Sequence, residues 1–193
     1  KRKLDQALGD FRILVRSKDM IGASWLHWLS WWLPTVVRGK DKLTGIVFVS
    51  DMPWVRSTCG WGAPVPYRHT SWGGPLFFLG PLLYSNGIRT HAFEDARPAE
   101  VVVDASGHAF SVLKAHVGAF DVGNDVGCSV QYQVVVDGKI RRETPVLRRG
   151  EFRSISVDVA GAKEIKLNVL NGGDGSDGDS AVWGFARFVQ AGA

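Results

Sequence analysis

From residue 43 to the C-terminus, apolar and polar residues alternate in short segments that are separated by turn residues. The segment 128–136 is the clearest case. One face carries Cys128, Val130, Tyr132, Val134 and Val136, and the other carries Ser129, Gln131 and Gln133. Successive side chains of a strand point to opposite faces, so this period of two predicts a strand with one buried face. Asp137-Gly138 follows directly and predicts a tight hairpin turn.

The same alternation recurs along the rest of the chain. Further strands are expected at Thr44–Ser50, Val101–Asp104, Ala109–Val117, Val146–Leu147, Glu151–Val159, Glu164–Leu170 and Ala181–Val189. No amphipathic helix pattern interrupts these strands. Many short strands with turn signals between them are typical of a sandwich. The sequence therefore predicts an all-β protein, an antiparallel β-sandwich of jelly-roll-like type over residues 43–193, preceded by an arm over residues 1–42.

The charge of the chain is unevenly distributed between these two parts. Residues 1–42 hold nine Lys and Arg against four Asp, whereas residues 43–193 hold fourteen against fifteen Asp and Glu. The basic pI of the whole chain, about 9.2, is therefore due to the arm. A nucleic-acid-binding body would carry a net basic surface, so we expect no nucleic-acid partner.

The arm contains a short Trp-rich helix, predicted at about residues 23–33. Its apolar residues recur at i, i+3, i+4 and i+7, and they are Trp25, Trp28, Leu29 and Trp32. About eleven residues reach only ~16 Å, which is too short for a hydrocarbon core of ~30 Å. The helix is therefore expected either to lie in a membrane interface or on a partner, or to pack on the body.

A second apolar stretch, the loop expected at residues 76–83, contains Phe77, Phe78, Leu82 and Leu83. These side chains are too many for a solvated loop, so the arm, a partner or lipid is expected to cover them.

The segment 171–183 holds three aspartates and four glycines between two predicted strands. It is either a solvated hairpin connection or part of an oxygen-ligand site for Ca²⁺. In the second case the expected ligands are Asp174 and Asp179, with Asp121 or Asp125 from another loop. Cys59 and Cys128 lack the spacing of a zinc site, and one disulfide between them is possible.

Several short motifs occur in one order along the chain. They are Ser50-Asp51-Met52-Pro53-Trp54, Gly60-Trp61-Gly62, Gly87-Ile88-Arg89-Thr90-His91-Ala92, Val117-Gly118 with Asp121, Val134 through Asp137-Gly138, and Gly173-Asp174-Gly175 before Asp179. This arrangement resembles the NPCBM domain, family 51 of the carbohydrate-binding modules, over about residues 44–190. The resemblance implies a β-sandwich accessory to secreted glycoside hydrolases, which binds terminal galactose-type sugars and often carries a structural Ca²⁺. It also implies an extracytoplasmic location, secreted or periplasmic.

The chain shows no nucleophile elbow, P-loop, HExxH or dinucleotide fingerprint. Together with the resemblance to a carbohydrate-binding module, this absence predicts that the chain is not an enzyme. Sugar binding needs an aromatic platform and a few fixed polar groups. The candidates are Trp61, Trp72, His91, Glu94, Asp174 and Trp183. His91 could equally be a buried structural histidine. Ser180-Ala181-Val182-Trp183 also departs from the His-Ala-Asp-Trp that such domains tend to show before the last strand.

These features leave a second function open. The Trp-rich arm and the 76–83 loop would also suit an accessory structural subunit of a membrane-associated protein complex, peripheral to the membrane.

Overall fold

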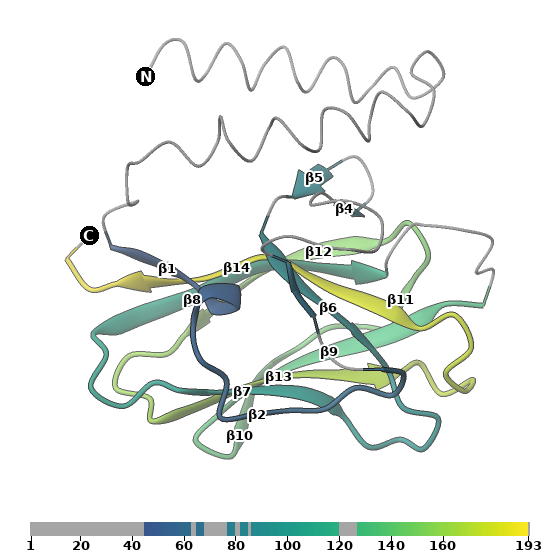
Figure 1. Cartoon of the computed structure of the whole chain (residues 1–193), viewed down its shortest axis with the longest axis horizontal. Helices are drawn as coiled ribbons and strands as arrows, with labels where there is room; N and C mark the ends of the chain where they lie inside the picture. The colour runs from purple at the N-terminus through teal and green to yellow at the C-terminus, as the bar shows by residue number, and fades with distance from the viewer. Residues whose placement is uncertain are drawn as a thin grey trace, which may run out of the picture.

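The computed structural model describes residues 45–62, 65–67, 77–79, 82–84, 86–119 and 127–192. In this part of the chain, two antiparallel six-stranded sheets face each other (Figure 1). The first contains, in spatial order, β12 (Phe152–Asp158), β8 (Phe110–Ala119), β14 (Ser180–Gln190), β6 (Gly87–His91) and β3 (Val65–Tyr67), and β1 (Ile46–Phe48) also pairs with β14. The second contains β10 (Lys139–Glu143), β9 (Ser129–Val136), β13 (Glu164–Asn171), β7 (Ala99–Asp104) and β2 (Arg56–Ser57), and β11 (Leu147–Arg148) also pairs with β9.

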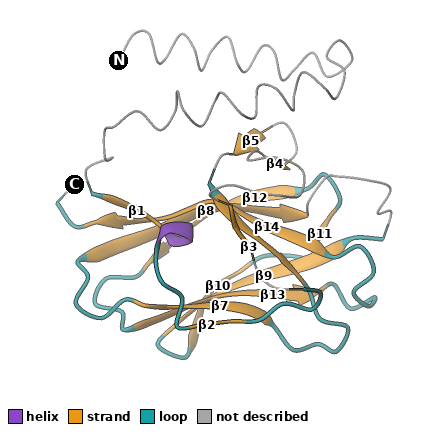
Figure 2. Cartoon of the chain, in the orientation of Figure 1, coloured by secondary structure: helices purple, strands orange, loops and turns teal. Residues whose placement is uncertain are grey.

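The predicted antiparallel β-sandwich is confirmed. Strands β6, β7, β8 and β9 alternate between the two sheets along the chain, so each sheet is built from distant segments (Figure 2). The residues predicted to share a face of β9 are buried, with Val130 0%, Tyr132 1% and Val134 1% exposed. They form one core with the inward residues of the opposite sheet.

The predicted hairpin after β9 is also present. Asp137 and Gly138 have φ of 48° and 77°, the left-handed values that a tight two-residue turn requires. The strand that follows, β10, was not predicted, because all five of its residues are exposed and it lacks an apolar face. Its position at the sheet edge explains its charged sequence, since edge strands are protected from further pairing by charge.

Trp183 lies in the core, which corrects its prediction as a sugar contact. Its side chain is 1% exposed, and its ring meets that of Tyr132 edge to face at 5.1 Å. The Tyr132 hydroxyl donates to the Gly118 carbonyl at 2.6 Å and accepts from the Val182 N–H at 3.0 Å. A buried indole cannot offer its face to a ligand, so Trp183 holds the two sheets together.

The segment expected as an apolar loop at 76–83 contains a two-stranded hairpin of β4 (Phe77–Leu79) and β5 (Leu82–Tyr84). Phe77 pairs with Tyr84, and Phe78 pairs with Leu83. These apolar residues favour extended backbone, and only Gly80 and Pro81 separate the two strands in sequence.

The helix expected at 23–33, with Trp25, Trp28, Leu29 and Trp32, lies outside the described residues. Among the residues that are described, no helix has the length and apolar character needed to cross a membrane. Cys59 and Cys128 are both free thiols.

Candidate functional site

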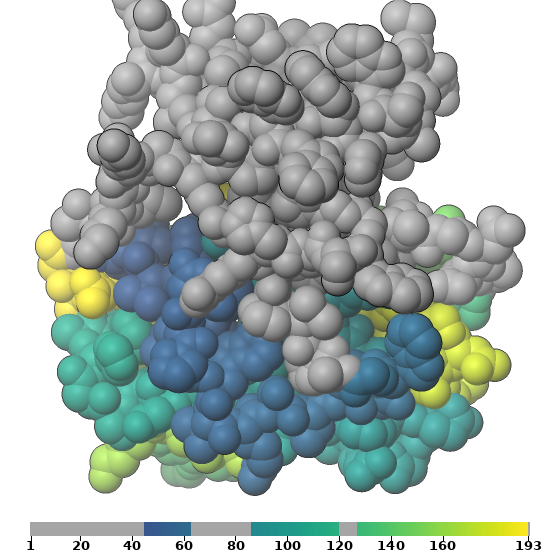
Figure 3. Space-filling view, viewed as in Figure 1, coloured from purple at the N-terminus to yellow at the C-terminus, as the bar shows by residue number. Residues whose placement is uncertain are grey.

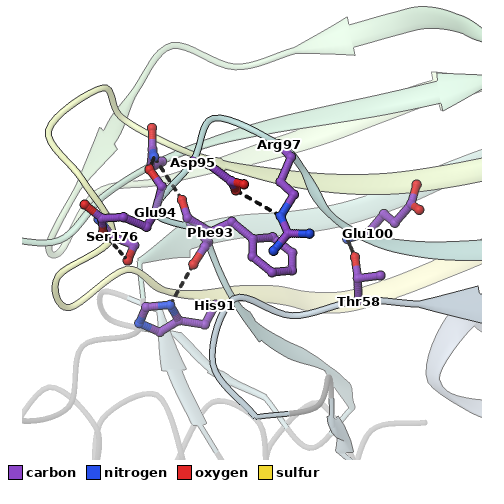
Figure 4. A network of polar contacts seen from close by, with 10 residues as sticks. Thr58, His91, Phe93, Glu94, Asp95, Arg97, Glu100 and Ser176 are labelled. Atoms are coloured by element: carbon purple, nitrogen blue, oxygen red, sulfur yellow. Dashed lines mark hydrogen bonds and ion pairs between the residues drawn. The ribbon is translucent and has the colours of Figure 1, made fainter.

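Three segments that are distant in sequence meet at one end of the sandwich (Figure 4). They are residues 58–62, residues 91–97 after β6, and the loop 171–179 between β13 and β14, which we call the acidic loop. The Gly60 N–H donates to the His91 carbonyl at 2.9 Å, which joins the first two segments. The Asn171 side-chain amide donates to the carbonyls of Phe93 at 2.9 Å and Glu94 at 3.0 Å, which joins the last two.

Trp61 is exposed beside His91. Its side chain is 71% exposed, and the centroids of the two rings are 6.5 Å apart at an interplanar angle of 55°. Gly60 makes this approach possible, because a Cβ at that position would lie 1.9 Å from the Ala92 carbonyl oxygen. The segment 45–62 runs across the face of the molecule shown in Figure 3. Gly60 therefore allows the exposed indole of Trp61 to lie beside His91.

His91 is half-buried and its ring is oriented by the backbone. Its Nδ1 lies 2.9 Å from the Ala92 carbonyl oxygen. A carbonyl only accepts, so Nδ1 carries the hydrogen of this bond, and in the corresponding neutral tautomer Nε2 is an acceptor. One of the two predictions for His91 was a structural role, and a bond to a backbone carbonyl fits that role. The same bond also orients the ring for a ligand. The thiol of Cys59 supports this position by accepting the His91 N–H at 3.2 Å.

Glu94 is fixed against the acidic loop. One of its carboxylate oxygens, Oε2, accepts from both the N–H of Ser176 at 3.0 Å and its hydroxyl at 2.8 Å (Figure 4). Ser176 and Asn171 were not among the predicted site residues. Their partners lie 77 to 82 positions away in sequence, so no local pattern could reveal them.

Asp174 and Asp179 lie on the other side of the acidic loop, near the start of β9. The Ser129 hydroxyl donates to Asp174 Oδ1, and the Arg148 guanidinium is 4.0 Å from Asp174 Oδ2. The Ser129 N–H donates to Asp179 Oδ1 at 2.8 Å. One residue, Ser129, therefore holds both carboxylates, and it was not predicted because the alternation of β9 places it on the outer face.

Asp179 is an unusual carboxylate for a surface loop. It is 1% exposed, and its Oδ2 has no hydrogen-bond partner within the described residues. Burial, together with the negative charges of Asp174 and Asp177, raises the pKa of Asp179 to about 6. A buried anionic oxygen without a partner is costly, and a cation would compensate it.

Three predicted site residues remain, one predicted to contact sugar and two predicted to bind Ca²⁺. Trp72, Asp121 and Asp125 lie outside the described residues. Within the residues that are described, no cluster of three or more His, Cys, Asp or Glu side chains could hold a metal ion.

The comparisons with known proteins agree with this architecture. The chain matches the NPCBM/NEW2 domain over residues 45–189. It is similar to CBM51-2 of Clostridium perfringens ZmpB, a structure that also includes INT domains, with 30% identity, a TM-score of 0.65 and coverage of 75% of this chain and 31% of that one. A structure of CBM51-2 in complex with GlcNAc is 29% identical over the same shares, again with a TM-score of 0.65.

A more distant similarity shows the fold alone. CBM51 from Clostridium perfringens GH95, solved with methyl-galactose, is 22% identical, with a TM-score of 0.63 and coverage of 74% of this chain and 99% of that one. No curated protein sequence matches the chain. The chain spans about a third of the length of the ZmpB chain that it matches. The match to the domain covers most of the residues, so the resemblance seen in the motifs is confirmed, and the chain belongs to the NPCBM/NEW2 domain family.

Proposed function

We propose that residues 45–189 form a non-catalytic, extracytoplasmic module that binds a terminal sugar, galactose-type or GlcNAc, between Trp61, His91 and Glu94. The exposed indole of Trp61 beside the oriented ring of His91 carries this proposal. Membership of the NPCBM/NEW2 family and the GlcNAc complex of the similar ZmpB domain support it.

The chemistry of the three side chains suits a sugar. An aromatic face packs against the C–H groups of a pyranose, while His91 Nε2 and the Glu94 carboxylate accept hydrogen bonds from its hydroxyls. Hydrogen bonds from Ser176 hold Glu94, so little side-chain freedom is lost on binding. Trp183 is left out because it is buried, and Asp174 is assigned to the cation site below.

Replacing Trp61 with alanine is expected to weaken binding of methyl-galactoside or GlcNAc by about tenfold, because it removes the apolar platform. Isothermal titration with millimolar sugar measures the effect. Val55→Ala is the matched control, since Val55 is 67% exposed in the same segment but precedes β2. If the unmodified chain binds neither sugar at millimolar concentration, the proposed function is wrong.

We further propose that a structural Ca²⁺ binds at the acidic loop. The partnerless Oδ2 of Asp179 and the neighbouring carboxylate of Asp174 supply two oxygen ligands of the kind that Ca²⁺ prefers. Asp121 or Asp125 would supply a further ligand. The cation would neutralise the buried charge of Asp179 and order the loop that carries Ser176.

Removing Ca²⁺ with EDTA is expected to lower the melting temperature by about 5–10 °C, the shift given by a ligand present at about a hundred times its dissociation constant. Melting scans with EDTA, and then with Ca²⁺ restored, measure this. Metal analysis of protein purified without chelator is the companion measurement. An unchanged melting temperature together with no bound metal would remove the cation from the proposal.

A further inference from the structure

Positive charge in the body is concentrated in residues 139–153. This stretch holds six of the fourteen Lys and Arg residues of 43–193, and we call them the basic strip: Lys139, Arg141, Arg142, Arg148, Arg149 and Arg153. Only Glu143 and Glu151 oppose them within the stretch. The rest of 43–193 holds eight basic residues against thirteen acidic ones, so the strip lies on an otherwise acidic body.

The fold brings these residues to one side of the sandwich. β10 is the edge strand of the second sheet, β12 is the edge strand of the first, and the two edges contact each other. Arg142 pairs with the core residue Val134, and Arg153 shares its strand face with the buried Ile155. Both arginines are exposed although they are on core-facing sides of their strands, so they lie along the seam between the sheets.

The basic strip begins at the acidic loop, on the opposite side of that loop from the proposed sugar site. The Arg148 guanidinium is 4.0 Å from Asp174 in the acidic loop, which also carries the Ser176 contact to Glu94. Arg148 pairs with Ser129 at the start of β9, whereas Lys139 pairs with Val136 at its end. Seven strand steps separate these positions, so the strip extends about 23 Å from the acidic loop along the sandwich.

The strip is accessible and combines charge with apolar surface. All residues of β10 are exposed, and the Arg148 side chain is 70% exposed. Two large apolar side chains lie among the charges, Ile140 at 57% and Val146 at 37% exposure. Protection of the edge strand β10 accounts for the charge on β10, but it does not require Arg148 in β11 or Arg149 in the turn before β12.

We propose that the basic strip binds an anionic polysaccharide, through sulfate or carboxylate groups that continue from the sugar held at Trp61, His91 and Glu94. Arginine matches this class of ligand, because its planar guanidinium donates two parallel hydrogen bonds to a sulfate or carboxylate. The ion pair of Arg148 with Asp174 is long and exposed, so it offers little competition to a ligand. The proposal rests on the proposed function for the class of ligand, but the strip is a separate surface.

The test uses the full chain and sulfated heparin oligosaccharides as the probe. The strip variant is Lys139→Gln/Arg141→Gln/Arg142→Gln, which stays polar at an exposed edge. The matched control is Arg56→Gln/Lys114→Gln/Arg187→Gln, which removes the same charge from β2, β8 and β14, outside the strip, and leaves the basic residues 1–42 unchanged. At 0.15 M NaCl the strip variant is expected to bind heparin about tenfold more weakly and with a shallower salt dependence, and the control less than threefold more weakly.

Two results would overturn the proposal: equal losses in the two variants, or strip-dependent binding to vesicles containing phosphatidylserine without strip-dependent binding to heparin. Titration with neutral GlcNAc and methyl-galactoside keeps the two proposals apart. An unchanged neutral-sugar affinity in the strip variant supports a separate basic surface for anionic ligands. If neutral sugars do not bind while heparin binding still depends on the strip, the sugar site fails and the basic strip stands.

Discussion

Replacing Trp183 with alanine is expected to lower the free energy of unfolding by about 3–5 kcal/mol, the usual cost of removing a buried aromatic side chain. Trp183 is 1% exposed, so its loss leaves a cavity between the sheets. It also removes the edge-to-face partner of Tyr132, whose hydroxyl joins β8 to β14. The expected loss in the free energy of unfolding therefore reflects weaker packing between the two sheets.

Urea unfolding followed by far-ultraviolet circular dichroism measures this loss without a tryptophan signal. Trp61→Ala is the matched control, since Trp61 is 71% exposed and its removal should change stability by no more than about 0.5 kcal/mol. Trp183→Phe, which fills part of the cavity, should fall between the two. A loss below about 1 kcal/mol for Trp183→Ala would show that the residue does not support the core.

In the presence of EDTA, the protein is expected to lose about 3 kcal/mol of stability as the pH rises from about 4 to 7, through the titration of Asp179. Burial raises the pKa of this carboxyl to about 6 from its ordinary value of 3.8. Between these two values the folded state binds the proton and the unfolded state has released it. Stability therefore falls as the pH rises through this window and stays low above it.

Chemical unfolding at pH 4.5, 5.5 and 7.0 in EDTA gives the slope of the free energy of unfolding against pH. Asp179→Asn should remove this contribution to the slope, because the amide does not titrate. Asp177→Asn, in the exposed part of the same loop, should retain most of it, because burial is the largest cause of the raised pKa and the charge of Asp177 contributes less. Added Ca²⁺ should restore stability at pH 7 and not at pH 4.5, because only the ionised carboxylate binds the cation. Equal slopes for Asp179→Asn and the unmodified chain would contradict the assignment to Asp179.

The all-β class and most strand positions could be predicted from the amino-acid sequence alone. The alternation around Tyr132 and the Asp137-Gly138 turn sufficed for β9 and its hairpin, because a strand with one buried face has a period of two and a tight turn needs positive φ. The ordered motifs around Trp61, His91 and Asp174 were also enough to recognise the family. These features are local, or they lie in one order along the chain.

The grouping of residues into one site could not be predicted and became visible only in the three-dimensional fold. Trp61 and Trp183 both suggest sugar platforms in sequence, but one is exposed and the other lies in the core. Ser129 and Ser176 carry no motif, yet they hold the carboxylates of Asp179 and Glu94. β10 was missed because a charged edge strand has no apolar period, and the charges of the basic strip lie along one seam because two edge strands meet. Burial and long-range hydrogen bonds depend on which distant segments the two sheets bring together, and a single sequence carries no local signal of that pairing.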